Sequence, residues 1–361
     1  MPTYTDARKR ADKKYTSNTD LLRVRLPKGK KAEIAAHADE MEETMGQFVF
    51  RAVNNTIQSD EIKASDSIDD KQLFKCIPQY KYKNGTIYNE DCIDFLKSIE
   101  TGTVDTIFAD PPYNIGKAEW DDLGNQDDYI NWSLSWIKEA SRILKDCGTL
   151  YVCGFTEILA DLRRPAMDYF TKCKWLIWYY DNKANMRDDW GRSHESIICF
   201  RKGSEFIFNT DDVRVPYNAH TRKYPKRSQS GKTSQFYNDK VAGKTWEPNP
   251  RGAKPKDVIN IPTTCNGMSE KTPHPTQKPE ELVRKMILAS TNKGDLVVDP
   301  FSGSGTTAVV ATQLGRKFIV NDQSSEYNDW ANQRILAVNN FDVDAWIEMD
   351  QKNDIRRRSI R

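Results

Sequence analysis

Asp110-Pro111-Pro112-Tyr113 concentrates side chains that could do chemistry in a very short stretch. It follows residues 104–109, whose β-branched and aromatic side chains predict a buried strand. Prolines fix φ and carry no N–H, so the loop is stiff and its carbonyls have no neighbouring donors. Asp110 and a carbonyl could accept the N–H groups of a flat, amino-bearing ring, while Tyr113 stacks on its face. A strand stopped by prolines and covered by a tyrosine is the plainer interpretation.

A second loop that could do chemistry, residues 299–307, follows the apolar residues 296–298. Gly303 and Gly305 would let the backbone approach a ligand where a strand turns into a helix. Asp322 ends the next predicted strand, at the position that commonly binds ribose hydroxyls. A lone G-x-G is more often a tight turn. Residue 308 is Ala and no Lys follows Gly305, so an adenosine ligand fits better than a dinucleotide or a bound phosphate.

The composition is that of a globular protein. Hydrophobic residues make up 38% and charged residues 29% of the 361 residues. No apolar run approaches the roughly 18 residues of a membrane helix, and the N-terminus has no secretory signal. The seven cysteines are scattered without a C-x-x-C pair, which predicts reduced thiols rather than disulfides or a zinc site. With only four histidines, we expect no metal and a cytoplasmic protein of two or three domains.

Two segments carry much of the positive charge. Residues 1–31 hold ten basic and three acidic residues, and residues 214–256 hold eleven and two, on a chain of net charge +2. The two segments together predict a polyanionic partner, although either one alone could be a solvated face. Residues 203–273 lose helical periodicity and interleave basic with aromatic residues, which favours nucleic-acid contact over disorder. The candidate DNA-binding residues in this region are Arg222, Lys223, Lys226 and Arg227.

Strands and helices alternate around these loops, which indicates an α/β fold with a mostly parallel sheet. Short apolar runs predict strands at residues 86–88, 104–109, 149–152, 175–178, 196–200, 296–298 and 317–320. Apolar residues at three- and four-residue spacing predict helices at residues 94–100, 127–144, 157–170, 279–287, 306–314 and 325–338. Asp127 is the expected cap of the second helix. The runs at 175–178 and 196–200 predict an antiparallel pair.

Residues 21–58 form a smaller unit. Residues 22–26 alternate apolar side chains with Arg23 and Arg25, which predicts a strand, and two short helices follow from about residue 30. Such a unit cannot bury its apolar faces alone, which predicts pairing with a second copy. The pattern resembles the ribbon-helix-helix family, whose intertwined dimers place a two-stranded ribbon in the major groove of DNA. Arg23 and Arg25 would then face the bases. A helical cap packed on the main domain is the alternative.

Three motifs of the main domain are similar, in this order, to those of one enzyme family. They are D-P-P-Y at 110–113, H-P-T-Q-K-P at 274–279 and D-P-F-S-G-S-G-T at 299–306. Over about residues 84–338 the chain resembles the permuted beta class of S-adenosyl-L-methionine-dependent DNA amino-methyltransferases. The resemblance implies a circularly permuted Rossmann-like fold: a mostly parallel seven-stranded sheet with helices on both faces, its catalytic half first. The strands before Asp110 and Asp299 would be neighbours at the switch point of this sheet.

The resemblance also implies a role for each matching residue. The catalytic residues would be Asp110, Pro111, Pro112 and Tyr113, which hold the target amine and stack on a flipped base. The cofactor-binding residues would be Asp91, Cys92, Thr276, Lys278, Asp299, Phe301, Ser302, Gly303, Ser304, Gly305, Thr306 and Asp322. Asp91 would contact the adenine of the cofactor and Lys278 would lie beside its methionine end. Asp91 could equally cap a helix, and the family usually has Glu where this chain has Asp322.

D-P-P-Y rather than S-P-P-Y points to N6 of adenine. We therefore expect a site-specific methyltransferase acting on double-stranded DNA, a homodimer, with a cognate restriction endonuclease as a candidate partner. N4-cytosine methylation and an inactive DNA-binding regulator are the alternatives. The expected segments are a DNA-binding and dimerisation domain at 1–60, a linker at 61–80, the catalytic half at 81–202, a target-recognition region at 203–273, the cofactor half at 274–345 and a basic tail at 346–361.

Overall fold

The computed structural model describes residues 28–40, 44–45, 48–49, 76–116, 121–182, 190–228 and 245–338. The chain forms two compact units, residues 1–60 and 61–361. In the first, α2 (Lys30–Glu40) is the first of the two helices expected there. The strand expected at residues 22–26, with Arg23 and Arg25, and the basic tail at 346–361 lie outside the described residues.

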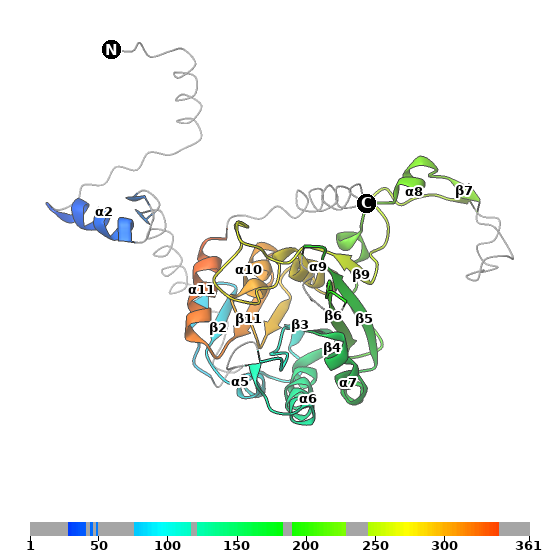
Figure 1. The fold of residues 1–361 in the computed structure, drawn as a ribbon, viewed down its shortest axis with the longest axis horizontal. Coiled ribbons are helices and arrows are strands. Elements are labelled where there is room, and N and C mark those ends of the chain that lie inside the picture. Colours follow the sequence, from blue (N-terminus) through cyan, green and yellow to red (C-terminus); the bar gives the residue numbers. More distant parts are fainter. Residues whose placement is uncertain are drawn as a thin grey trace, which may run out of the picture. The chain divides into compact units, whose positions relative to one another are not determined.

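The second unit is built on a nine-stranded sheet in the order β1-β2-β11-β10-β3-β4-β6-β5-β9 (Figure 1). Its strands are β1 (Tyr80–Tyr82), β2 (Gly85–Tyr88), β3 (Val104–Ala109), β4 (Leu144–Gly154), β5 (Lys172–Tyr179), β6 (His194–Arg201), β9 (Val258–Asn260), β10 (Leu296–Asp299) and β11 (Lys317–Asn321). Among these strands five pairings are parallel and three antiparallel, and β5 and β6 form the expected antiparallel pair. The expected number of seven strands was wrong, because β1 and β9 add an edge strand on either side.

Helices cover both faces of this sheet. They are α5 (Cys92–Ser98), α6 (Gln126–Ile143), α7 (Thr156–Ala166), α9 (Glu280–Ser290), α10 (Thr306–Gln313) and α11 (Ser325–Leu336), with 3-10 turns η2 (Met167–Tyr169) and η3 (Thr210–Val213). The first three pack together on one face, and α9, α10 and α11 pack on the other (Figure 1). Covered on both sides, β3 is buried at every residue. No helix in the described part of the chain is both long and apolar enough to cross a membrane.

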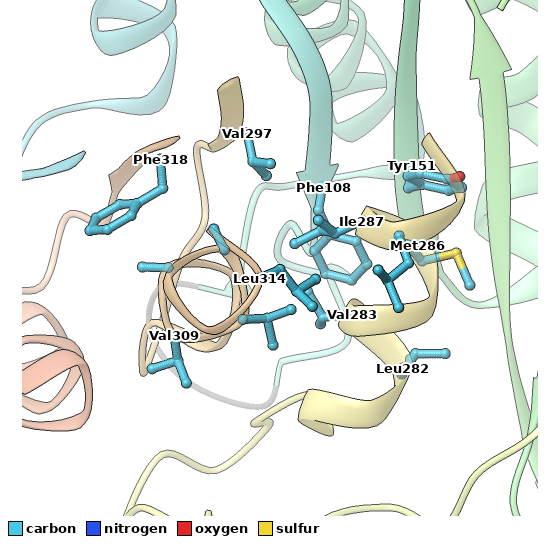
Figure 2. Packing of buried hydrophobic residues seen from close by; sticks show 14 of the residues in the cluster. Phe108, Tyr151, Leu282, Val283, Met286, Ile287, Val297, Val309, Leu314 and Phe318 are labelled. Atoms are coloured by element: carbon cyan, nitrogen blue, oxygen red, sulfur yellow. The ribbon is translucent and has the colours of Figure 1, made fainter. Parts of the chain in front are cut away.

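The hydrophobic core beneath α9 holds this helix against the central strands. Phe108 of β3 and Tyr151 of β4 pack against Val283, Met286 and Ile287 of α9 (Figure 2). All five side chains are buried, and each contributes about 1.5–3 kcal/mol by leaving water. The segment that leads into α9 is thereby held over the carboxyl ends of the central strands.

Several element boundaries differ from those expected. The cap of α6 is Asn125, whose side chain accepts from the backbone N–H of Asp128 at 3.0 Å, so the expected cap Asp127 was wrong. Strand β4 begins at Leu144, the residue at which the helix had been expected to end, and not at the expected residue 149. The segment 203–273 also holds short elements: α8 (Ala219–Lys223), a β7–β8 pair (Arg227–Ser228 with Thr245–Trp246), and β9 in the sheet.

Strands β3 and β10 lie side by side and parallel, with Val297 beside Thr106. From β3 the chain continues through α6 to β4 on one side, and from β10 it continues through α10 to β11 on the other. Since the two connections diverge over opposite faces, the loops after β3 and β10 open a crevice at the strand ends. The expected adjacency of the two loops is confirmed.

Candidate active site

The loops after β3 and β10 line one cavity of about 670 Å³, within the range of small-molecule sites. Of the residues predicted from sequence to be catalytic or cofactor-binding, fifteen line it: Asp91, Cys92, Asp110, Pro111, Pro112, Tyr113, Thr276, Lys278, Asp299, Phe301, Ser302, Gly303, Ser304, Thr306 and Asp322. Gly305 is the exception. It precedes α10 in the left-handed region at φ +77°, and a Cβ there would meet Ala331 of α11. Gly305 therefore allows close packing of the loop on a helix.

The Asp110–Tyr113 loop is held rigid by residues that sequence reasoning missed. The carboxylate of Asp121, 1% exposed, accepts from the backbone N–H groups of Tyr113 and Asn114 at 2.7 Å each. The hydroxyl of Tyr129 donates to the carbonyl of Pro112 at 2.8 Å. With these contacts the loop is preorganised for a ligand rather than shaped by it. The Pro112 carbonyl is thus engaged, contrary to the expectation of unpaired carbonyls.

Four polar side chains meet at the base of the cavity. The ammonium of Lys278 lies 2.7 Å from Asp110 Oδ2 and 3.4 Å from Glu195 Oε2. The hydroxyl of Tyr113 lies 2.9 Å from Asp110 Oδ1 and 3.0 Å from Glu195 Oε2. One cation and one phenol thus bridge two carboxylates, and at most 16% of any of the three charged side chains is exposed. We call Asp110, Tyr113, Glu195 and Lys278 the polar quartet.

The charges of the polar quartet fix its protonation. Burial by itself lowers the pKa of Lys278, but the carboxylates of Asp110 and Glu195 outweigh it and the pKa lies above its ordinary value. Burial, and then the same two carboxylates, raise the pKa of the Tyr113 hydroxyl well above 10.0. Lys278 is therefore an ammonium and Tyr113 a neutral phenol across the physiological range, and the quartet carries a net charge of −1 when both carboxyls are ionised.

The glycine loop is tied to the neighbouring strand end. Asp322 accepts from the backbone N–H of Gly303 through Oδ2 and from that of Ser324 through Oδ1, both at 2.9 Å. Burial raises the pKa of Asp322. Gly303 has φ +50°, and a Cβ there would lie 2.9 Å from His274 Nε2, so a larger residue would displace the H-P-T-Q-K-P segment. Asp322 organises the loop at the same time as it lines the cavity.

Asp91 and Cys92 line the cavity at the start of α5. Asp91 caps α5, since its Oδ1 accepts from the backbone N–H groups of Ile93 and Asp94, while Gln323 donates to its Oδ2 at 3.1 Å. Asp91 is thus both the helix cap and a cavity residue. Burial raises the pKa of the Cys92 thiol to about 12, so this thiol stays protonated.

Asp299 is a buried carboxyl at the root of the glycine loop. It accepts from the Phe301 backbone N–H at 2.9 Å and from the Thr307 hydroxyl at 2.5 Å. Burial nevertheless raises its pKa from 3.8 to about 7, because these two hydrogen bonds only partly offset the loss of water.

We expect Asp299→Asn to remove part of the pH dependence of folding. A raised pKa means that the folded state binds the proton more tightly. Stability from this group is therefore fully present below pH 3.8 and declines as the pH rises to about 7. Urea unfolding of both proteins between pH 4 and pH 8 measures this decline. Asp322, whose pKa is also raised, is present in both and cancels in the comparison. Parallel curves for the two proteins would contradict the prediction.

Of the DNA-binding residues predicted in segment 203–273, Arg222, Lys223 and Lys226 are not among the residues that line the cavity. Arg222 and Lys223 are exposed at the end of α8, and Lys226 is exposed and forms an ion pair with Glu247 at 2.9 Å. Arg227 begins β7. Further cavity residues that were not predicted include Trp132, Phe155, Trp178, Arg192, Glu195 and His274. Of these six, His274 alone had a visible signal, because it begins the H-P-T-Q-K-P motif.

Comparison with known proteins connects this site to a family. The family model described as DNA methylase matches residues 104–333. The chain is 34% identical to "Type II methyltransferase M1.MboII" of Moraxella bovis, over 71% of this chain and 97% of that protein. It is 32% identical to "DNA adenine methyltransferase YhdJ" of Escherichia coli (strain K12), over 76% and 91% of the two chains. The solved structure of "PvuII DNA methyltransferase (cytosine-N4-specific)" has the same fold, with TM-score 0.56 and 19% identity over 78% of this chain and 96% of that one.

Proposed function

This chain belongs to the DNA methylase family, and from that premise we propose that it methylates N6 of an adenine flipped out of duplex DNA. The methyl donor is S-adenosyl-L-methionine. The observation that carries the proposal is the opening of the Asp110–Tyr113 loop and the glycine loop into one cavity. One loop offers acceptors for an amino group, the other a backbone cradle for an adenosine ligand, and β3 and β10 place them side by side.

The choice of adenine rests on the motif and on one relative. Asp110 begins the motif D-P-P-Y, whereas a serine at this position, as in S-P-P-Y, would indicate an N4-cytosine enzyme of the family. The Escherichia coli relative, whose name is that of a DNA adenine methyltransferase, is 32% identical over 91% of its length. N4 of cytosine remains the second candidate, because an exocyclic amino group is common to both bases.

The residues of the glycine loop fit S-adenosyl-L-methionine. The hydroxyl of Ser302 is buried, lines the cavity and has no hydrogen-bond partner in the described part of the chain, which suits a polar ligand atom. We assign Phe301, Ser302, Gly303 and Ser304 to the cofactor, together with Asp322 toward its ribose and Asp91 toward its adenine. When bound, the cofactor supplies an activated sulfonium methyl group, so no nucleophilic side chain is required.

The catalytic loop aligns the amino group. The Pro112 carbonyl already accepts from Tyr129, so we assign the two N–H groups to Asp110 and to the carbonyl of Pro111. An ionised carboxylate has about four lone-pair positions, so Asp110 can bind the amine while it keeps Tyr113 and Lys278. Acceptors on both N–H groups leave the nitrogen lone pair pointing at the methyl group and stabilise the positive charge that develops there.

Base flipping gives the amine access to this loop. Taking a base out of the stack costs about a few kcal/mol, and stacking on an aromatic ring returns about 1–3 kcal/mol. Tyr113 is the stacking partner that we propose. Its ring meets Phe155 edge to face at 5.0 Å between centroids, and its hydroxyl is held by Asp110 and Glu195. With the ring fixed at both ends, little conformational entropy is lost when a base stacks on it.

We further propose that the protein has the circular permutation of the beta class, in which the catalytic loop after β3 precedes the cofactor loop after β10 in the chain. Residues 21–58 would form a ribbon-helix-helix domain that makes the protein a homodimer and binds DNA through Arg23 and Arg25. The exposed basic residues Arg222, Lys223 and Lys226 would contact the DNA backbone from the target-recognition region. Type II relatives such as M1.MboII make a cognate endonuclease a further candidate partner.

The test is incubation of the full chain with methyl-labelled S-adenosyl-L-methionine and duplex DNA of mixed sequence. Nucleoside analysis of the product should give N6-methyladenine. N4-methylcytosine would instead establish the second candidate. The absence of labelled product on every duplex would refute the proposed enzymatic activity and favour a DNA-binding regulator.

We expect Arg23→Ala/Arg25→Ala to weaken DNA binding and to reduce its dependence on salt. Removing positive charge that displaces counterions from the DNA should make the negative slope of log K against log [salt] shallower, by up to about 0.9 for each arginine removed. Fluorescence anisotropy with a labelled duplex at several salt concentrations measures this slope. Lys138→Ala/Lys317→Ala removes the same charge from exposed residues of the second unit and serves as the control. An unchanged slope would favour a structural cap at residues 21–58.

A further inference from the structure

In the function proposed so far, Glu195 lines the cavity and holds the Tyr113 hydroxyl but takes no part in the chemistry. It is the second residue of β6, its carboxylate is 15% exposed, and Oε2 faces the catalytic loop. It lies 3.0 Å from the Tyr113 hydroxyl and 3.4 Å from the Lys278 ammonium. A carboxylate buried this deeply in an active-site cavity is costly unless its partners are fixed. The polar quartet fixes them.

The Tyr113 hydroxyl forms a bridge between two carboxylates. It has one proton and lies within hydrogen-bond distance of both Asp110 Oδ1 and Glu195 Oε2. It can donate to only one of them at a time, and its oxygen can accept from the other once that carboxyl is protonated. A phenol in this position can pass a proton from one carboxyl to the other without leaving its place.

We propose that Glu195 is the final acceptor of the proton that the target amino group loses on methylation, received from Asp110 through the Tyr113 hydroxyl. The inference rests on the proposed function, because it concerns the same amine and the same cavity. Glu195 does not touch the amine, so it is a positioning residue for the proton rather than a catalytic residue.

The atoms balance along this route. The nitrogen lone pair forms the new N–C bond, and the C–S bond breaks with its electron pair remaining on sulfur. The nitrogen then releases one proton to Asp110 Oδ1. Asp110 passes this proton from Oδ1 to the Tyr113 oxygen as the proton of Tyr113 moves to Glu195 Oε2. One proton has moved from the amine to Glu195, Asp110 is again a carboxylate, and Tyr113 is again a neutral phenol whose proton now lies toward Asp110.

The remaining quartet member is unsuited to receive the proton. Lys278 also touches both carboxylates, but its raised pKa keeps it an ammonium, which has no lone pair to offer. The raised pKa of Tyr113 means that its hydroxyl gives up a proton only as it gains one. Cys153, also beside these charges, is a thiol whose pKa is raised well above 9.0, chiefly by burial. The Asp110–Tyr113–Glu195 path is the one that the contacts support.

The experiment compares Glu195→Gln, Tyr113→Phe and the double variant in single-turnover methyl transfer to duplex DNA at saturating S-adenosyl-L-methionine. Glutamine keeps the shape of Glu195 but takes no proton, and phenylalanine keeps the stacking ring without the hydroxyl. Each single variant should be about 10²-fold slower, at the lower end of what proton transfer contributes. Because both interrupt one path, the double variant should be no slower than the slower single variant. Losses that multiply would overturn the relay, since independent effects add in free energy.

The controls separate this inference from the proposed function. Glu205→Gln makes the same change at an exposed residue beyond β6 and should methylate at the wild-type rate. If wild type does not methylate DNA, the proposed function fails. If wild type methylates and Glu195→Gln matches it, only the relay fails. Should Glu195→Gln not fold, Tyr113→Phe decides: a wild-type rate overturns the proposal, and an approximately 10²-fold loss with unchanged affinity for S-adenosyl-L-methionine supports it.

Discussion

We expect Asp110→Ala to lower the single-turnover rate of methyl transfer by about 10³-fold or more, while affinity for S-adenosyl-L-methionine stays within a few-fold of wild type. Asp110 is the side chain at the end of β3 that can both orient the amino group and stabilise the positive charge that develops on its nitrogen. Phe301, Ser302, Gly303 and Ser304, which we assign to the cofactor, lie on the neighbouring loop after β10 and keep their places, since Asp322 and Asp299 hold that loop. The substitution should therefore lower the rate of methyl transfer without lowering the affinity for the cofactor.

The fold should survive this substitution. Lys278 is 8% exposed and would lose its partner at 2.7 Å, but Glu195 remains 3.4 Å away to balance its charge. Asp168→Ala removes the same side chain from an exposed position and should leave both the rate and the affinity unchanged. Turnover by Asp110→Ala at anything near the wild-type rate would refute the role of Asp110. Joint loss of rate and cofactor affinity would mean that Asp110 chiefly maintains the cavity.

The central sheet could be predicted from sequence because its signals are local. Residues 104–109 and 296–298 are short, mostly apolar runs that end at loops rich in Pro or Gly, so their strands and the adjacent loops were correctly placed. The edge strands β1 and β9 could not be predicted. Each has three residues, and β9, at the edge of the sheet, pairs with β5, about 80 residues earlier in the chain. Their conformation is set by the strand that they join rather than by their own sequence.

The partners of the catalytic loop were beyond sequence analysis for a related reason. Glu195 reaches Tyr113 across 82 residues, and Lys278 reaches Asp110 across 168. Neither spacing follows a repeat, so these contacts exist only once β6 and the segment before α9 are packed on the sheet. The motif resemblance implied a place for Lys278 beside the cofactor but gave no sign that its ammonium also contacts the catalytic carboxylate. Asp121 lies close in sequence, but an acidic residue in a polar loop has no feature that distinguishes it from a solvated one.

The two glycines of the cofactor loop illustrate what geometry adds to a motif. Both were predicted to admit a ligand close to the backbone. The space beside Gly303 is taken by His274, and the space beside Gly305 by Ala331 of α11. Arg334, also on α11, donates to the carbonyl of Ser304 at 2.8 Å and to the Thr306 hydroxyl at 3.0 Å. Helix α11 thus supports the cofactor loop through the hydrogen bonds of Arg334, and Gly305 is the residue at which the loop packs against this helix.

We therefore expect Gly305→Ala to destabilise the protein by about 2–5 kcal/mol and to weaken binding of S-adenosyl-L-methionine. A non-glycine residue in the left-handed region costs about 1–2 kcal/mol. The new Cβ would lie 2.8 Å from Ala331 Cα and closer still to its Cβ, and overpacking of this kind costs about 1–3 kcal/mol more. Moving α11 away to make room would draw Arg334 from the loop, so affinity falls although Gly305 does not line the cavity.

Gly102→Ala is the matched control that separates backbone strain from the clash. Gly102 has φ +73°, close to the +77° of Gly305, and a Cβ there would meet nothing within 4 Å. Urea unfolding should give Gly102→Ala only the strain of about 1–2 kcal/mol, with cofactor affinity unchanged in isothermal titration. If Gly305→Ala is no less stable than Gly102→Ala, the contact between the new Cβ and Ala331 does not destabilise the protein. If it is less stable but binds the cofactor as wild type does, α11 supports the fold without positioning the loop.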